Sequence, residues 1–268
     1  MCGRFVTVSS PQSLVERFGV DESMVEGHDP DYNVTPRAMV PVVRERRRDG
    51  AEQRVLSLLR WGLVPSWAES PAIGDKLINA RAESVAEKPA YKRAFRRRRC
   101  IVPADAFYEW QVLTAAPAAP GTRSRKPPRQ PYVIRRRDGE PLAFAGLWEI
   151  WRDPEVTDDD APDAWLRSCA IVTTQANDLL APIHSRMPVV LAEGAWDQWL
   201  DPALDGTPSL ESLLAPAPDE WFEAYPVSSR VNSPQNNDAD LLQEVEPAEA
   251  QAPPEPVGSP TLWNPSDI

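Results

Sequence analysis

The sequence predicts an α+β fold: a single domain built on a curved, largely antiparallel β-sheet, barrel-like, with short flanking helices. Many short segments alternate apolar and polar residues, or run apolar, between Gly, Pro and Asp turns, and only a few have helical spacing. The 268-residue chain is 42% apolar and contains 10 tryptophans, enough to fill one sizeable core. No glycine-rich phosphate-binding motif joins a strand to a helix, and no GxSxG motif marks an esterase.

The predicted strands are segments rich in β-branched and aromatic residues, each bounded by turn residues. They cover residues 3–8, 39–44, 54–64, 100–102, 105–110, 131–137, 141–150, 165–174 and 222–227. Asp49-Gly50 and Asp138-Gly139 are turn dipeptides, so the strands on either side of each should form a hairpin. One more strand should begin just after His184.

The predicted helices are short. Residues 10–19 form an amphipathic helix, because Ser10 can cap it, Pro11 suits its first position and Gly19 can end it. Residues 20–37 look irregular. The other expected helices lie over residues 89–97, just before His184, over 196–200 and around 210–214.

We expect one domain over residues 1–246, after removal of Met1. Residues 115–131 are rich in Pro and Ala and should form a surface loop. Residues 247–268 form an acidic tail rich in Pro, Ala and Glu, which has few core-forming residues and should be disordered.

Composition excludes several classes of protein. Three cysteines at irregular spacing and two histidines provide neither a disulfide framework nor a zinc knuckle, so we expect a cytoplasmic protein with no metal and no cofactor. No run of 18 apolar residues occurs and the first residues have no apolar segment, so neither a membrane span nor a signal peptide is indicated. We expect a monomer.

The net charge of -11 is unevenly distributed. Residues 1–150 contain 25 Lys and Arg against 18 Asp and Glu, whereas residues 151–268 contain 4 against 22. The balances are +7 and -18, which suggests a basic working face joined to an acidic remainder. The alternative is that each arginine run is simply a solvated surface.

Cys2 carries the most informative chemistry. If Met1 is removed, Cys2 presents an amine and a thiol on adjacent carbons, and this 1,2-aminothiol can capture an aldehyde as an imine and then as a five-membered thiazolidine. A terminal amine with a pKa of about 7.8 is roughly one-seventh neutral at pH 7, whereas a lysine is neutral in roughly one molecule in 2,500. The free amine is the form that attacks a carbonyl. Alternatively, Cys2 is a small apolar residue of the first strand.

Other residues could complete such a site. Trp61 and Trp67 flank a turn beside Arg60, which could form a stacking platform for unpaired bases, or the rings could pack inward. Glu109 stands among aromatic residues that should raise its pKa toward neutrality, where a proton shuttle works best. It could instead pair with an arginine. His184 lies at an element boundary, either as a working side chain or as a structural one.

Taken together, seven motifs in this order resemble the SRAP family, the SOS response-associated peptidases. They are MCGRF at 1–5, YNVTP at 32–36, RWGLVPSW at 60–67, INARAE at 78–83, CIVPAD at 100–105, FYEW at 107–110 and IHSRMP at 183–188. The resemblance implies a protein of the DNA damage response that shields abasic sites in single-stranded DNA by crosslinking through an N-terminal cysteine. It also implies the label of a peptidase, which refers to the loss of Met1, and we expect a weak lyase activity at abasic sites as a side reaction.

The resemblance also implies roles for individual residues. The catalytic set would be Cys2, Asn79, Glu109 and His184. The positions that match DNA contacts are Arg4, Trp61, Trp67, Arg81 and Arg186. The longer loop 115–131 and the acidic tail depart from the compact family pattern, but neither overlaps a matched motif.

Two other functions remain possible on sequence grounds. An N-terminal-nucleophile amidohydrolase would use the Cys2 thiolate on an amide with its own amine as base. A non-covalent single-strand binding module would bind DNA without an adduct, and its binding would weaken steeply with salt.

Overall fold

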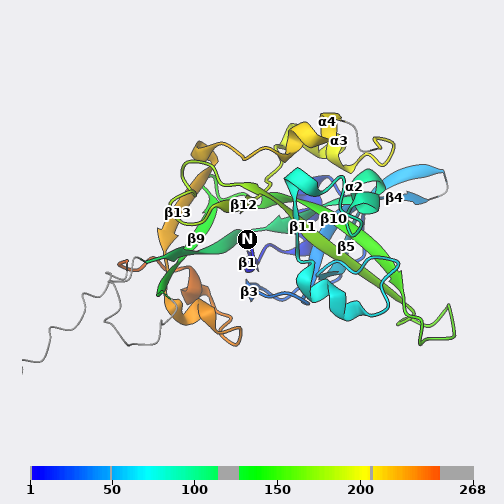
Figure 1. Ribbon diagram of the computed structural model, residues 1–268, viewed down its shortest axis with the longest axis horizontal. Coiled ribbons are helices and arrows are strands. Elements are labelled where there is room, and N and C mark those ends of the chain that lie inside the picture. The colour runs from blue at the N-terminus through cyan, green and yellow to red at the C-terminus, as the bar shows by residue number, and fades with distance from the viewer. Residues whose placement is uncertain (1, 49, 114–126, 206–207, 248–268) are drawn as a thin grey trace, which may run out of the picture.

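A closed barrel of five strands organises the structure (Figure 1). The computed structural model describes residues 2–48, 50–113, 127–205 and 208–247. The barrel strands are β4 (Met39–Arg48), β5 (Ala51–Trp61), β7 (Arg99–Ala104), β10 (Leu142–Arg152) and β11 (Trp165–Gln175). Neighbours pair antiparallel in the order β11-β10-β7-β4-β5, and a parallel β5–β11 pairing closes the ring.

Short strands extend this barrel at its edges. β6 (Asn79–Arg81) pairs parallel with β11, β12 (Arg186–Pro188) pairs antiparallel with β11, and β2 (Glu22–Ser23) pairs parallel with β5. β6 and β12 therefore both pair with β11, although about 100 residues separate them in sequence.

A second sheet, wholly antiparallel, packs against one end of the barrel. Its order is β13 (Phe222–Pro226), β9 (Arg129–Arg136), β8 (Ala106–Val112), β1 (Phe5–Thr7) and β3 (Asp31–Val34). The ring of Phe5 lies 4.9 Å from that of Trp61 and 6.2 Å from that of Phe144, both from barrel strands. These contacts fix the N-terminal strand against the barrel.

The helices are short and cover the outside of the barrel. They are α1 (Pro11–Phe18), α2 (Lys92–Arg97), α3 (Trp196–Leu200) and α4 (Pro208–Glu211). Single 3-10 turns occupy Pro71–Lys76, Ala82–Ser84, Glu193–Ala195, Ser212–Leu214, Asp219–Trp221, Ser229–Asn232 and Ala239–Leu242. In α1 the Ser10 side chain accepts from the backbone N–H of Ser13, and Gly19 ends the helix at φ +60°, a left-handed conformation that favours glycine.

Alternation along the barrel strands separates two cores. On β10, Ala143, Ala145 and Leu147 face the helices, whereas Leu142 and Phe144 face the barrel interior and the second sheet. The interior is tightly filled: at Gly146 a Cβ would lie 2.8 Å from the Sγ of Cys100, so no larger residue fits without movement. The interior core continues into the residues around Cys2.

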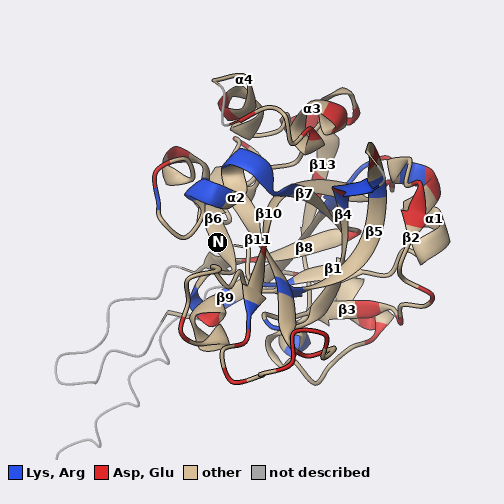
Figure 2. Cartoon of the chain, turned by 90° about the vertical axis from the view of Figure 1, so that its right-hand side faces the viewer, with Lys and Arg blue, Asp and Glu red and all other residues tan. Residues whose placement is uncertain are grey.

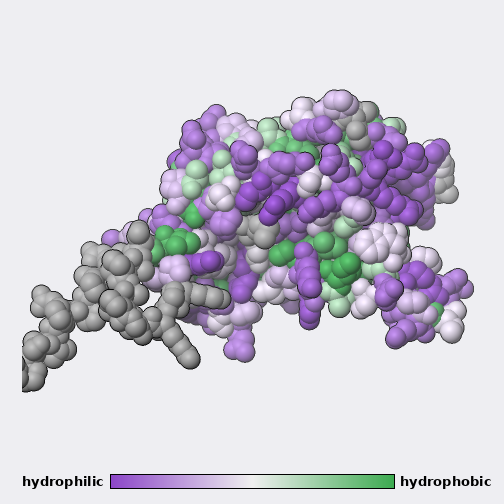
Figure 3. Space-filling model, in the orientation of Figure 1, coloured by the Kyte–Doolittle hydropathy of each residue, from purple (hydrophilic) through white to green (hydrophobic). Residues whose placement is uncertain are grey.

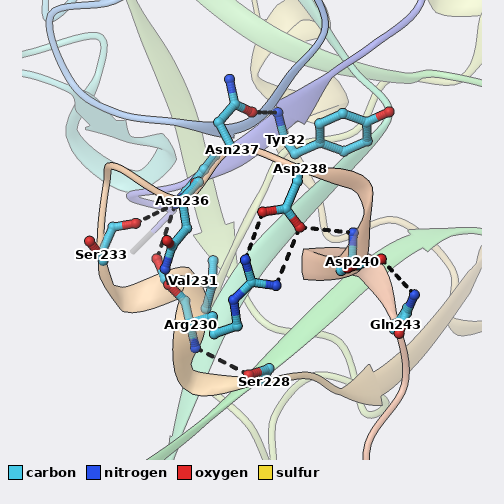
Figure 4. Close-up of polar contacts among 11 residues, drawn as sticks. Tyr32, Ser228, Arg230, Val231, Ser233, Asn236, Asn237, Asp238, Asp240 and Gln243 are labelled. Carbon is cyan, nitrogen blue, oxygen red and sulfur yellow. Dashed lines mark hydrogen bonds and ion pairs between the residues drawn. The ribbon is translucent and has the colours of Figure 1, made fainter.

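Residues 228–243, near the end of the described chain, form what we call the C-terminal clasp (Figure 4). Arg230 and Asp238 form an ion pair at 2.8 Å, and the backbone N–H of Tyr32 donates to Oδ1 of Asn237 at 2.7 Å. Together with Val227, the apolar residues Val231 and Leu241 pack against the outer face of the second sheet. The clasp thereby ties the end of the described chain to β3.

The α+β prediction is confirmed, and the helix at 10–19, the hairpin of β4 and β5 and the helix at 196–200 match closely. Three predictions were wrong in detail. Residues 20–37 contain β2 and β3, the helix expected over 89–97 begins only at Lys92, and turns rather than a helix precede His184. Most of the loop 115–131 and of the tail 247–268 lies outside the described residues. Of the helices described, none has the length and apolar character to traverse a bilayer.

Candidate active site around Cys2

Cys2 lies just before β1, fully buried between the second sheet and the barrel. Its thiol is 3.8 Å from the carbonyl oxygen of Arg4, to which it donates. Burial is the main cause that raises the pKa of this thiol, and the negative charge of Glu109 raises it further. A buried thiol of this kind stays protonated until a reaction partner reaches it.

Asn79 makes the most direct contact with Cys2. Its Nδ2 donates to the carbonyl oxygen of Cys2 at 2.7 Å. Strand β6 holds it in place, since Asn79 pairs with Ile171 of β11 and its own carbonyl accepts from the hydroxyl of Tyr91 at 2.9 Å. Its Oδ1 is buried and has no hydrogen-bond partner among the described residues, so one acceptor next to Cys2 is open to a further group.

Glu109 stands on β8, with Phe107 two residues before it. Because side chains alternate along a strand, Glu109 shares a face with Phe107, which belongs to the same apolar cluster as Cys2. Its carboxyl is buried, and this burial raises its pKa. The electrostatic interaction with His184 lowers this pKa in part, so the two side chains are electrostatic neighbours.

His184 is held by the strand that follows it. Its Nδ1 accepts from the backbone N–H of Arg186 at 3.0 Å. Nδ1 also lies 3.2 Å from the carbonyl oxygen of Arg186, to which it would donate in the other tautomer. The backbone of Arg186 thereby fixes the orientation of the ring in either tautomer.

Two residues outside the matched motifs brace this part of the site. Nε2 of Gln111, on the same face of β8 as Glu109, donates to the carbonyl oxygen of Pro182 at 3.1 Å. The Tyr132 hydroxyl donates to Oε1 of Gln111 at 3.2 Å. The sequence offered only one signal for Gln111, its i+2 spacing from Glu109, and none for Tyr132 or Tyr91.

The side chain of Arg4, two residues after Cys2, bonds to β3 and to the C-terminal clasp. Its guanidinium donates to Oδ1 of Asn33 at 2.6 Å and to the carbonyl oxygen of Val231 in the C-terminal clasp at 2.8 Å. Asn33 is buried, and its Nδ2 also donates to the carbonyls of Val231, Ser233 and Asn236. Asn33, from the YNVTP motif, thus joins Arg4 to the clasp.

The two tryptophans of the RWGLVPSW motif have opposite environments. Trp61 is 0% exposed, and its Nε1 donates to the carbonyl oxygen of Ile78 at 3.0 Å. The expectation that Trp61 contacts DNA is therefore corrected: it faces the barrel interior with Leu59, where it cannot stack on a base. Trp67 is 59% exposed and remains available for stacking.

The basic candidates near the site also differ. Arg81 is exposed on β6, whereas Arg186 forms an ion pair with Glu83 and donates to the carbonyl oxygen of Thr173 at 2.6 Å. The hydrogen bond from Arg186 is the main cause that lowers the pKa of Glu83. Arg186 is thus already engaged within the protein.

Helix α2 contributes a basic surface beside Trp67. A hollow of about 490 Å³ is lined by Pro89, Lys92, Arg93, Arg96, Arg97 and Asp205. Arg93 donates to the hydroxyl of Ser66, next to Trp67, at 3.3 Å. The molecule is strongly hydrophilic around this helix in Figure 3.

In the part of the chain that the structure describes, no three His, Cys, Asp or Glu side chains come together as ligands for a metal ion. The four predicted catalytic residues come from four separate segments. A hydrogen bond joins Asn79 to Cys2, and electrostatic interactions join Glu109 to both Cys2 and His184. The arrangement places a thiol, an amide, a carboxyl with a raised pKa and an imidazole in one region.

Comparisons with known proteins agree on one group. A family model described as SOS response associated peptidase (SRAP) matches residues 1–234. Abasic site processing protein YoqW of Bacillus subtilis is 41% identical over 244 residues, which cover 91% of this chain and 99% of that protein. Abasic site processing protein HMCES of Xenopus tropicalis is 30% identical over 232 residues, covering 81% of this chain and 67% of that protein.

Solved structures give the same result for the fold. A crystal structure of a protein from Bacteroides thetaiotaomicron matches with a TM-score of 0.73 and 25% identity, covering 91% of this chain and 100% of that one. A phage-related protein from Bordetella bronchiseptica matches with a TM-score of 0.60 and 32% identity, covering 84% of this chain and 94% of that one.

Proposed function

This chain belongs to the SOS response associated peptidase family, and from that premise we propose that it processes abasic sites in single-stranded DNA by linking covalently to them through Cys2. The link would form once Met1 is removed and would protect the site during the DNA damage response. The relatives named abasic site processing proteins support this substrate. The observation that carries the proposal is the 2.7 Å hydrogen bond from Asn79 to Cys2, beside the buried carboxyl of Glu109.

The first step is the opening of the abasic sugar, which exists mainly as a closed hemiacetal. Opening takes a proton from the anomeric hydroxyl and returns one to the ring oxygen, which exposes an aldehyde. Glu109 is suited to this exchange because burial raises the pKa of its carboxyl, so it can hold a proton closer to neutral pH than a solvated glutamate can. His184 would serve as its partner in this exchange.

The second stage forms two bonds to the aldehyde carbon. The Cys2 amine adds to that carbon, and loss of one water gives an imine. The thiol then adds across the C=N bond: sulfur bonds to carbon, the thiol proton moves to nitrogen, and a thiazolidine closes. The raised pKa of the thiol suits this order, since sulfur stays protonated until the imine forms. Reversal would use the same proton transfers.

The imine stage has a predictable side reaction. An imine acidifies the hydrogens on the adjacent carbon, so elimination of the 3′ phosphate would compete with ring closure. We infer a weak lyase activity that increases when the thiol is absent. Self-cleavage would be limited to the loss of Met1.

Single-stranded DNA fits the surface around the site. Trp67 offers an exposed ring on which an unpaired base can stack, and Arg81 offers an exposed cation for the backbone. The basic face of α2 lies next to Trp67 and would follow the phosphates further along the strand.

A denaturing gel tests the proposal. Purified protein lacking Met1 is incubated with an oligonucleotide that contains one abasic site, and a slower band marks the covalent adduct. Cys2→Ala should give no stable adduct, and Cys2→Ser should give only species that borohydride traps, because serine keeps the amine but lacks the sulfur. A stable adduct with Cys2→Ala would overturn the proposal.

The same preparation separates the rival functions. An amidohydrolase would turn over an amide and ignore the oligonucleotide. A non-covalent binder would retain full affinity in Cys2→Ala without any adduct, and its affinity would fall with salt.

A further inference from the structure

Arg44 is a buried cation at the barrel end opposite Cys2. It is 5% exposed, and its Nε donates to the hydroxyl of Ser57 at 3.2 Å. Its guanidinium lies 4.8 Å from the ring centre of Trp148. Its two Nη nitrogens have no hydrogen-bond partner among the described residues.

A second buried arginine shows what a structural role looks like in this protein. Arg99 is 3% exposed, and it donates to the carbonyls of Phe95, Arg96, Trp199 and Asp201. Each of its nitrogens therefore has a protein acceptor. Burial lowers the pKa of both arginines to about 10, but only Arg44 leaves donors unused.

The charged neighbours of Arg44 are cations. Arg46 stands two residues further along β4, on the same face as Arg44, and Arg167 of β11 pairs with Ile150, which shares a face of β10 with Trp148. After burial, the positive charges of Arg167 and Arg46 are the main causes that lower the pKa of Arg44. Arg167 is exposed and has no hydrogen-bond or ion-pair partner among the described residues. Arg46 is paired with Glu22 through one nitrogen, at 2.8 Å, yet its Nε is buried without a partner.

Another unpaired polar atom lies next to Arg46. Gln53 faces Arg46 directly in the β4–β5 ladder, and its Oε1 is buried without a partner. The oxygen and nitrogen of such an amide can exchange places by a 180° turn, so Gln53 can also present its NH₂ group. Unused donors thus gather where three arginines converge.

We propose that this end of the barrel binds a phosphate-type oxyanion, with Arg44 and Arg167 as its principal donors. A guanidinium offers two parallel N–H groups that match the spacing of oxyanion oxygens, and burial strengthens such bonds. The ring of Trp148 already carries two guanidinium groups, those of Arg44 and Arg98, so it does not offer a free face for a nucleobase. A compact oxyanion suits this surface better than a stacked nucleotide.

The site is separate from Cys2. Asn79, which binds Cys2, pairs with Ile171 of β11, and Arg167 stands four residues away along that strand, about 13 Å at 3.3–3.4 Å per residue. Gly146 lies between the two ends, where even a Cβ would clash with Cys100. The packed interior makes the two ends independent, so binding at one does not require chemistry at the other.

Titration with inorganic phosphate tests the proposal. Phosphate binding is measured by calorimetry and by the shift in Tm, with sodium chloride at matched ionic strength as the reference. Wild type and Cys2→Ala should both bind phosphate, and Arg167→Gln should weaken the affinity about tenfold or more, as expected for loss of a charge-assisted hydrogen bond. The matched control is Arg137→Gln, which removes an exposed arginine just after β9 and should leave the affinity unchanged.

Arg44 needs a variant that keeps the fold. Arg44→Lys retains the buried charge but loses the two-pronged donor, so it should fold and bind phosphate more weakly than wild type. The proposal is overturned if phosphate raises Tm no more than chloride does, or if Arg137→Gln weakens binding as much as Arg167→Gln.

A competition experiment between inorganic phosphate and an oligonucleotide shows whether the bound oxyanion belongs to DNA or is free phosphate. If the oxyanion belongs to DNA, an undamaged single-stranded oligonucleotide displaces inorganic phosphate from the Cys2→Ala protein, and Arg167→Gln weakens that displacement. If free phosphate is the ligand, the oligonucleotide leaves phosphate binding unchanged. Both outcomes are judged apart from crosslinking at Cys2, which the denaturing gel measures.

Discussion

The side-chain amide of Asn79 donates to the carbonyl oxygen of Cys2 at 2.7 Å, across 77 positions of the sequence. This bond fixes the backbone of the residue whose amine and thiol would react. Asn79 is in turn fixed by β11 and by Tyr91. Removal of the amide should therefore affect the reaction more than the fold.

Asn79→Ala should slow adduct formation about 100-fold, the cost typical of a misplaced reacting group. The rate is measured by quenched gel assays with an abasic oligonucleotide. Asn236→Ala is the matched control, because it also removes an amide-to-carbonyl bond, from Asn236 to Arg230 at 2.7 Å, but in the C-terminal clasp. Equal rates for Asn79→Ala and wild type would contradict the positioning role.

Glu109→Gln should stabilise the fold while it abolishes rapid crosslinking. Burial raises the pKa of Glu109, so between its unfolded and folded pKa values the folded state holds a proton that the unfolded state has released. Stability from this group is thus present at low pH and is lost as pH rises through that interval. In thermal unfolding from pH 4 to pH 8, the Tm of Glu109→Gln should increase relative to the Tm of wild type as pH rises.

One outcome would contradict the prediction for Glu109. A Tm difference between Glu109→Gln and wild type that stays constant or shrinks with rising pH would mean that the carboxyl is not destabilised by burial. Activity lost without any change in this profile would assign Glu109 a role in binding instead.

Trp67→Ala should weaken binding to undamaged single-stranded DNA by about 1–3 kcal/mol, the usual contribution of base stacking. Fluorescence anisotropy with a labelled oligonucleotide measures the affinity. Trp165→Ala is the control, since Trp165 is also exposed but lies at the far end of β11. Equal losses in the two variants would argue against a specific stacking role for Trp67.

Asn33→Ala should lower the free energy of unfolding by about 2–3 kcal/mol, because it leaves the Arg4 guanidinium and three clasp carbonyls without their shared partner. Urea unfolding at equilibrium measures this loss. Gln243→Ala removes a surface bond to Asp240 and should stay within about 0.5 kcal/mol of wild type. If Asn33→Ala also lost no more than about 0.5 kcal/mol of unfolding free energy, Asn33 would not brace Arg4 and the clasp.

Local patterns were sufficient to predict much of the fold. Ser10, Pro11 and Gly19 mark the limits of α1 because caps act over a few residues. Barrel closure could not be predicted this way, since it depends on the parallel pairing of β5 with β11, more than 100 residues apart. Trp61 was misplaced for a related reason: its inward direction follows from its alternation with Leu59, and only the closed barrel shows which side is inside.

The candidate site depends even more on long-range structure. The four predicted catalytic residues lie on four separate segments: Cys2, Asn79, Glu109 and His184. No rule of sequence spacing predicts that they come together, and only the resemblance to a known family grouped them. The uneven charge also has a simpler role than expected. Acidic residues of the second half pair with arginines of the first, as in Arg54–Asp197 at 2.7 Å and Arg135–Glu223 at 2.6 Å.

The bond from Arg4 to the carbonyl oxygen of Val231 spans 227 positions of the chain. During synthesis, the residues beside Cys2 leave the ribosome long before the segment that braces them has been made. At about 5–20 residues per second, this interval lasts roughly 11–45 seconds. If Met1 is removed while the chain is being made, that interval is the time available before the final packing shelters Cys2.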